Sequence, residues 1–134
     1  MLRRRFLVLA AVAAAILAPS GCGGGEDEPT FFRLQQTLEC LRADDIPAKT
    51  SGLDFVAGTA PGGALRAPLG LNEVVIAFGT TRREAVALED AYERFGTDRP
   101  GVQDRLFRTR NVVLVWAGPP SPEELDRVTG CLKG

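Results

Sequence analysis

Two unbroken runs of large apolar residues constrain this sequence more than any other feature. The first reads VVIAF at positions 74–78, and the second reads VVLVW at positions 112–116. Each run is rich in β-branched residues and is apolar at odd and even positions alike, so each predicts a strand that is covered on both faces. We expect the first of these strands to lie centrally in a sheet.

Three other segments show the pattern of amphipathic helices. Residues 30–43 have apolar side chains at the spacing of one helical stripe, residues 81–95 begin with a capping box, and residues 121–132 repeat that box with proline at the first helical position. The stripes consist of Phe31, Leu34, Leu38 and Leu41, then Ala85, Leu88, Ala91, Tyr92 and Phe95, and finally Leu125, Val128 and Leu132. Each helix should therefore pack one face inward.

Two further strands are predicted between the first two helices. Residues 53–56 indicate one strand, and residues 64–69 indicate a second, weaker one. Pro68 has no N–H for a ladder hydrogen bond, so this second strand belongs at a sheet edge or ends there. Residues 97–110 are polar and rich in arginine, and within them residues 105–108 fit a short strand as well as a helical turn.

The resulting order of elements is α-β-β-β-α-β-α, in a single domain over residues 30–134. Residues 73–117 would form a βαβ unit, which makes the sheet mixed. We therefore predict an α+β fold, a two-layer sandwich of one mixed sheet under helices. Its architecture resembles the ferredoxin-like folds without their first strand, and this comparison implies nothing about function.

The first 21 residues have the organisation of a secretory signal peptide. A basic start, MLRRR, precedes thirteen uncharged and mostly apolar residues from Phe6 to Ala18. This stretch is shorter than the ~20 apolar residues that a membrane-spanning helix needs. We therefore expect residues 1–21 to direct export and to be removed.

The residues around Cys22, Ala18-Pro19-Ser20-Gly21-Cys22, resemble the lipobox of bacterial lipoproteins. Ser20 and Gly21 fit the small residues of the box, while Pro19 stands where the family favours leucine. The resemblance implies that Cys22 receives diacylglycerol on its sulfur and becomes the first residue of a membrane-tethered protein. The alternative is ordinary cleavage near Ala18, which would release a soluble secreted protein. Residues 22–29 contain no large apolar side chain and fit a flexible spacer.

Cys40 and Cys131 form a pair near the two ends of the domain. In an oxidising compartment an even pair favours a disulfide, and closing a loop of about ninety residues would stabilise the domain by roughly 4–5 kcal/mol. Cys40 lies off the apolar stripe of its helix, so the bond would have to form at the helix flank or end. The wide spacing is unlike a redox CxxC pair, and two thiols without imidazole are too few for zinc. Two free buried thiols are the alternative.

The complete absence of histidine limits the chemistry open to this chain. It excludes histidine-dependent nucleophiles, and the sequence contains neither a calcium-binding loop nor a phosphate-binding glycine motif. Residues 22–134 carry thirteen basic and seventeen acidic side chains, a net charge of −4, which argues against nucleic-acid binding. We therefore expect no cofactor, no metal site and no catalytic residue.

Several smaller groups have both a structural and a functional interpretation, and the structural one is favoured for each. Asp44 and Asp45 end a helix, with a cation site as the functional alternative, and Gly58, Gly62, Gly63 and Gly70 form turns, with a phosphate cradle as the alternative. Arg99, Arg105, Arg108 and Arg110 form a solvated edge, and their alternative is a site for an anion or a lipid head group. Tyr92 and Trp116 are core aromatics, and their alternative is the lining of a ligand pocket.

These observations predict a non-catalytic envelope protein that is tethered to a membrane through Cys22. Its disulfide-closed domain would bind an unidentified protein or small-molecule partner. The alternative is a small extracytoplasmic enzyme or solute-binding domain that uses carboxylates and arginines, with its site near residues 58–70 or 97–110.

Overall fold

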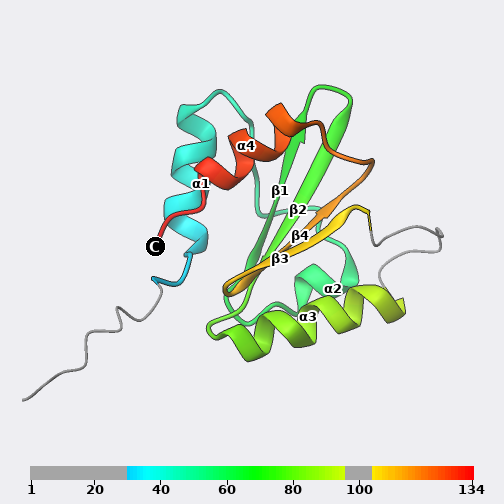
Figure 1. The fold of residues 1–134 in the computed structure, drawn as a ribbon. Coiled ribbons are helices and arrows are strands. Elements are labelled where there is room, and N and C mark those ends of the chain that lie inside the picture. Colours follow the sequence, from blue (N-terminus) through cyan, green and yellow to red (C-terminus); the bar gives the residue numbers. More distant parts are fainter. Residues whose placement is uncertain (1–29, 96–103) are drawn as a thin grey trace, which may run out of the picture.

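The computed structural model describes residues 30–95 and 104–134 of the chain (Figure 1). The predicted signal peptide and spacer, residues 1–21 and 22–29, lie outside the described residues, and so does Cys22. Within the described part, no helix has both the length and the apolar character needed to cross a membrane.

One sheet of four strands forms the centre of the fold. Its strands are β1 (Ala64–Leu69), β2 (Asn72–Phe78), β3 (Leu106–Thr109) and β4 (Val112–Trp116), in the spatial order β1-β2-β4-β3. All three neighbouring pairs are antiparallel. The two apolar runs thus become β2 and β4, which lie side by side in the middle of the sheet as their two-sided apolar character requires.

The expected βαβ unit takes a different form, and the prediction of a mixed sheet is wrong, because every pair of neighbouring strands is antiparallel. β2 and β4 are antiparallel neighbours, because residues 106–109 form the additional strand β3 and a tight turn then reverses the chain into β4. Helix α3 (Arg82–Phe95) therefore connects β2 to β3. Those two strands run in the same direction with β4 inserted between them.

Helices cover both faces of the sheet, as Figure 1 shows. Helices α1 (Leu34–Ala43) and α4 (Pro122–Gly130) lie on one face, while α2 (Phe55–Gly58) and α3 lie on the other. The α+β sandwich is thus confirmed, with three layers in place of two. The reason lies in the central strands, since each has apolar side chains on both faces and each face needs a helical cover.

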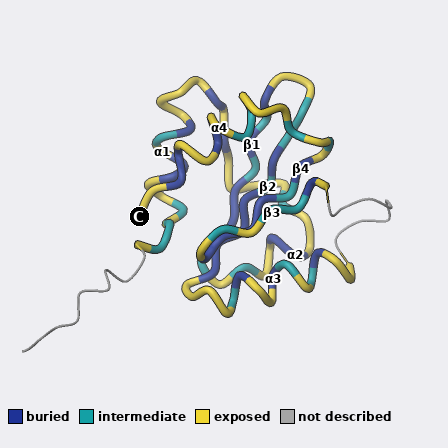
Figure 2. The backbone as a smooth tube through the Cα atoms, in the orientation of Figure 1, coloured by how far each residue is buried: buried dark blue, intermediate teal, exposed yellow. Residues whose placement is uncertain are grey.

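Two apolar clusters fill the spaces between the layers, and Figure 2 shows the buried residues concentrated along the sheet. The larger cluster joins α1 and α4 to one face through residues that include Leu41, Ile76, Leu114 and Val128. The smaller cluster joins α2 and α3 to the other face around Tyr92.

The prediction of a strand at residues 53–56 is wrong, because the short helix α2 begins at Phe55 and residues 53 and 54 belong to no regular element. Asp54 caps α2 by accepting a hydrogen bond from the backbone N–H of Ala57 at 2.8 Å. Phe55, an apolar residue of the predicted strand, is 82% exposed and contributes nothing to the core. The free edge of β1 is instead met at one point, where Lys49 and Arg66 exchange two backbone hydrogen bonds.

The Cys40–Cys131 disulfide is confirmed. It joins α1 to the end of α4, with the two Cα atoms 5.4 Å apart across 91 positions of sequence. Both cysteines pack on the larger cluster, and Cys131 is only 4% exposed. The bond therefore connects the first and last helices of the domain on the same face of the sheet.

Candidate functional site

The best-defined polar arrangement in the described residues is centred on Asn111. This residue stands in the two-residue turn between β3 and β4, and it is only 1% exposed. Its Oδ1 accepts a hydrogen bond from the N–H of Phe32 at 2.8 Å, and its Nδ2 donates to the carbonyl oxygens of Phe32 at 2.8 Å and Gly79 at 2.7 Å. The amide therefore pairs with the backbone of Phe32 as a neighbouring strand would, and it also holds the end of β2.

Three further interactions fix the segment before α1. The N–H of Arg33 donates to the carbonyl of Lys133 at 2.7 Å, which ties the segment to the C-terminal residues. The guanidinium of Arg110 donates to the carbonyl of Thr30 at 3.0 Å, and it lies 4.9 Å from the centre of the Phe32 ring. A cation over an aromatic face is attracted to it. The segment is therefore held against the domain at Thr30, Phe32 and Arg33.

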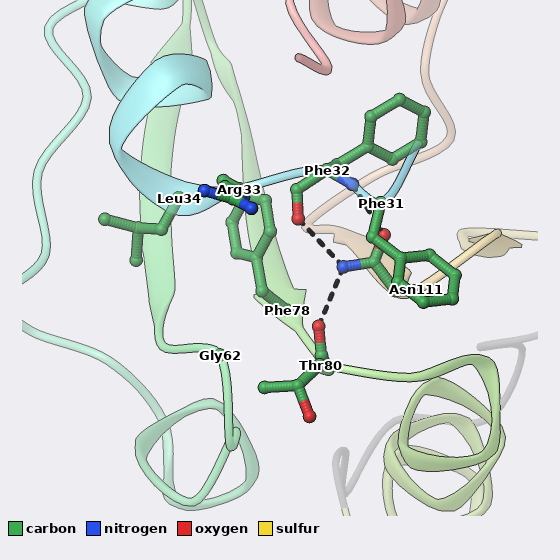
Figure 3. Close-up of a pocket in the computed structure, with 9 residues that line it drawn as sticks. Phe31, Phe32, Arg33, Leu34, Gly62, Phe78, Thr80 and Asn111 are labelled. Atoms are coloured by element: carbon green, nitrogen blue, oxygen red, sulfur yellow. Dashed lines mark hydrogen bonds between the residues drawn. The ribbon is translucent and has the colours of Figure 1, made fainter. Parts of the chain in front are cut away.

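A pocket of about 370 Å³ opens beside this segment (Figure 3). It is lined by Phe31, Phe32, Arg33, Leu34, Gly62, Phe78, Gly79, Thr80 and Asn111. A second pocket, of about 380 Å³, lies between β3, β4 and α4, and Phe32 lines it too. The segment before α1 thus forms a shared wall between two shallow pockets at one end of the sheet.

The lining of the first pocket suits the binding of a small molecule. Its side chains are mainly aromatic and aliphatic, and the amide of Asn111 is fully occupied by backbone partners. The hydroxyl of Thr80 donates to Glu84 at 2.7 Å. No group of three or more potential metal ligands occurs in residues 30–95 and 104–134. A small apolar group could enter this pocket. The Thr80 hydroxyl does have a carboxylate beside it, but the hydrogen bonds from Thr80 lower the pKa of Glu84 and make that carboxylate a weaker base.

A buried phenol marks the opposite face of the sheet. Tyr92, which is 1% exposed, donates its hydroxyl hydrogen to the carboxylate of Asp54, with oxygen-to-oxygen distances of 2.9 and 3.1 Å. Burial, and then the negative charge of Asp54 beside the phenol, raise the pKa of Tyr92 far above its usual value near 10. Since Asp54 also caps α2, this pair joins α2 to α3 and does not resemble an acid-base couple poised near neutral pH.

The residues that the sequence analysis considered as candidate sites do not come together in the structure. Asp44 pairs with Arg127 at 3.1 Å, and Asp45 adopts a positive φ of 57° just after α1, so this pair ends the helix. Gly62 lines the pocket described above. Gly70, with φ of 60°, forms the turn between β1 and β2.

The arginines of residues 99–110 do not converge on one point. Arg105 is buried and donates to the carbonyl of Ala117 at 2.8 Å. Arg108 pairs with Glu89 at 3.1 Å, and Arg110 covers Phe32. Arg99 lies outside the described residues. No shared anion site is formed by the three arginines that the structure describes.

Asn111 is the residue that sequence reasoning missed. The signal was present, since a polar amide stands directly before an apolar strand and two adjacent phenylalanines precede the first helix. Its partners, however, are 79 and 32 positions away in sequence, and no local pattern connects them. Trp116 and Tyr92 do belong to the core, as predicted.

No family model matches the chain, and neither the curated proteins nor the solved structures contain a significant match.

Proposed function

We propose that this chain is an exported envelope protein, lipid-tethered at Cys22, whose disulfide-closed domain has a non-catalytic binding role. The observation that carries the proposal is which of the three cysteines of the sequence form the disulfide. Two of them, Cys40 and Cys131, form a disulfide within the domain, which leaves Cys22 alone behind an apolar segment. Disulfides persist mainly in oxidising compartments, so the bond supports a site of action outside the cytosol.

The N-terminal sequence supports the same location independently. A basic start, a short apolar stretch and small residues before Cys22 are typical of export signals. The resemblance of residues 18–22 to a lipobox supports acylation at the Cys22 sulfur. Multiple acyl chains would make a stable tether, whereas a single chain is marginal.

A non-catalytic role is supported by how the chemistry-bearing side chains are used. Tyr92 is bonded to Asp54, and Arg66 pairs with Glu73 at 2.6 Å on the surface of the sheet. Glu84 and Glu124 each accept hydrogen bonds at the start of a helix. These groups stabilise the fold, and none of them faces the pocket beside Asn111 as an unoccupied acid or base.

A second candidate function is the binding of a small apolar solute. The pocket beside Asn111 favours it, because Phe31, Leu34 and Phe78 give it an apolar lining. A ligand there would stabilise the native state in proportion to its concentration. A saturable rise in Tm, or a change in Trp116 fluorescence, on titration with small apolar compounds would support this function over the first.

Intact mass and cell fractionation of the wild type and of Cys22→Ala test the proposal. The wild type should fractionate with membranes, lack residues 1–21 and carry added acyl mass at Cys22, and its domain cysteines should become alkylatable only after reduction. Cys22→Ala should lose the acyl mass and the membrane association. Ser20→Ala is the control, since a small residue is retained at that position and processing should be unchanged.

Two outcomes would contradict the proposal in different ways. A full-length chain with reduced cysteines in the cytosol would remove the case for export. A chain cleaved near Ala18 without acyl mass would leave export intact and replace the tether with a soluble secreted form.

A further inference from the structure

The chain enters the domain at a defined end. Residues 30–33 are clamped by Asn111, Arg110 and the backbone of Lys133, so residue 30 lies beside the β3–β4 turn. In Figure 1 this is the end at which α1 begins, α3 begins, and the C-terminal residues lie. The preceding chain is therefore attached to the domain at this end, away from the β1–β2 turn at Gly70.

Exposed cations gather at the same end. Arg33 precedes α1, Arg82 and Arg83 open α3, and Lys133 is tied to Arg33 through the backbone. All four are exposed, and within the described residues none of these side chains has a hydrogen-bond or ion-pair partner. Arg110 adds a fifth positive charge. We call these five residues the basic end.

Two carboxylates of α3 near the basic end are already engaged. Glu84, on the first turn of α3, accepts hydrogen bonds from the N–H and hydroxyl of Thr80. Glu89 pairs with Arg108. The opposite end of the domain carries negative charge, because Glu123 and Glu124 lie there at the start of α4, near Asn72 of the β1–β2 hairpin. The domain therefore presents a positive surface on the side where the chain enters.

The chain between Cys22 and residue 30 is short. Eight residue steps span at most about 28 Å when fully extended, and a flexible chain of that length has an average end-to-end distance of about 16 Å. The spacer contains Glu26, Asp27 and Glu28, so its own charge would be repelled by an anionic surface. Attraction to such a surface would therefore come from the domain, and the basic end is where the chain joins it.

We propose that the basic end docks on anionic phospholipid head groups of the membrane that holds the chain. The inference rests on the proposed acylation of Cys22, because the short tether keeps this end at a high effective concentration next to the bilayer. Arginine and lysine bind phosphate through charge-assisted hydrogen bonds, and each basic residue near an anionic bilayer strengthens binding about fivefold. The domain would then stand on the membrane with its acidic end facing away.

Arginine-selective labelling of the membrane-extracted protein tests this orientation. The protein is reconstituted into vesicles of phosphatidylcholine, with and without phosphatidylglycerol, and the labelling rate of each arginine is read by peptide mass spectrometry. Arg33, Arg82 and Arg83 should react several-fold more slowly in the anionic vesicles, and high salt should abolish the protection. Arg94, at the far end of α3, is the internal control and should react equally in both.

Two charge variants sharpen the test. Arg82→Gln/Arg83→Gln should weaken salt-sensitive protection at Arg33 about fivefold for each charge removed. Lys49→Gln/Arg94→Gln removes the same charge from exposed positions outside the basic end and should leave that protection unchanged. Equal effects of the two variants, or equal labelling in both types of vesicle, would overturn the proposal. Protection by free glycerol phosphate at matched concentration would also overturn it in favour of a soluble phosphate ligand.

Failure of this inference can be distinguished from failure of the proposed function. The intact mass of the same preparation reports whether Cys22 carries acyl chains. If it carries none, the chain is added to preformed vesicles, and salt-sensitive flotation with phosphatidylglycerol still tests the basic end. Acylation together with uniform arginine labelling would disprove the docking surface and leave the tether intact.

Discussion

The side-chain amide of Asn111 hydrogen-bonds both the N–H and the carbonyl of Phe32, 79 positions earlier in the chain, each at 2.8 Å. The side chain of an asparagine in a tight turn thereby forms the two hydrogen bonds that the backbone of a neighbouring strand would form, and it attaches the segment before α1 to the sheet. The third bond, to the carbonyl of Gly79, secures the end of β2 at the same point.

Replacing Asn111 by alanine should therefore destabilise the domain strongly. The substitution leaves one N–H and two carbonyl groups without their partner in a largely buried site, and we expect a loss of about 2–4 kcal/mol in the free energy of unfolding. Urea denaturation followed by Trp116 fluorescence measures it. Native-state hydrogen exchange should also show reduced protection at the amide of Phe32.

Gln35→Ala is the matched control for this experiment. It truncates another side-chain amide, whose exposed bond to Glu39 joins positions i and i+4 of α1. Such a pair contributes roughly 0.2–0.5 kcal/mol. If Asn111→Ala lowered the free energy of unfolding no more than Gln35→Ala does, the hydrogen bonds between Asn111 and Phe32 would not contribute to stability.

The disulfide should supply a large part of the stability of the domain. Cys40→Ala/Cys131→Ala removes a cross-link over 91 positions, for which the chain-entropy model gives a loss of roughly 4–5 kcal/mol. The midpoint of urea denaturation should fall accordingly, and reductant should lower it in the wild type but not in the double variant. Cys22→Ala, which lies outside the domain, should leave the midpoint unchanged.

The parts of this fold that the sequence predicts are those with local causes. The strands at residues 74–78 and 112–116 follow from their apolar content, and the capping box at Ser121 and Glu124 has the predicted reciprocal bonds. The direction of β4 could not be read in the same way. It depends on β3, whose four residues, LFRT, are too short and too polar to stand out from a turn.

The candidate site is less predictable for the same physical reason. Phe55 reads as a core residue because it is apolar, yet it is 82% exposed, and the decisive local signal is the capping carboxylate of Asp54. The local signal at Asn111, a polar amide directly before an apolar strand, does not reveal its partners, because they come from two distant segments. The cysteine pair was predictable because disulfide chemistry requires a partner, whatever the intervening fold.

Tyr92 should make the domain sensitive to alkaline pH. Its pKa is raised in the folded state, first by burial and then by the Asp54 charge, while in the unfolded chain it titrates near 10. The raised value means that this contribution to stability is complete below pH ~10 and is lost progressively above it, because only the unfolded state then releases the proton.

Ultraviolet titration can follow this group without ambiguity, because Tyr92 is the single tyrosine of the chain. Phenolate absorbance should appear only together with unfolding, well above pH 10, and Tyr92→Phe should abolish the signal. The variant should also lose about 1–2 kcal/mol at neutral pH, since the hydrogen bond to Asp54 is gone. A phenolate that formed reversibly near pH 10 in the native protein would contradict the buried, carboxylate-bonded phenol.

Acid should weaken the domain through two helix caps. Hydrogen bonds from Thr80 lower the pKa of Glu84, and the backbone N–H of Ser121, followed by the amide of Asn72, lowers the pKa of Glu124. Because the folded-state values lie below the unfolded ones, this stabilisation is present above pH ~4.5 and disappears as the pH falls through the lowered values. Glu84→Gln/Glu124→Gln should therefore flatten the acid branch of a plot of Tm against pH. Glu123→Gln is the control, because Glu123 is a neighbouring exposed carboxylate outside the capping box, and it should leave the acid branch unchanged. If both variants flattened the acid branch equally, general charge and not helix capping would set the acid sensitivity.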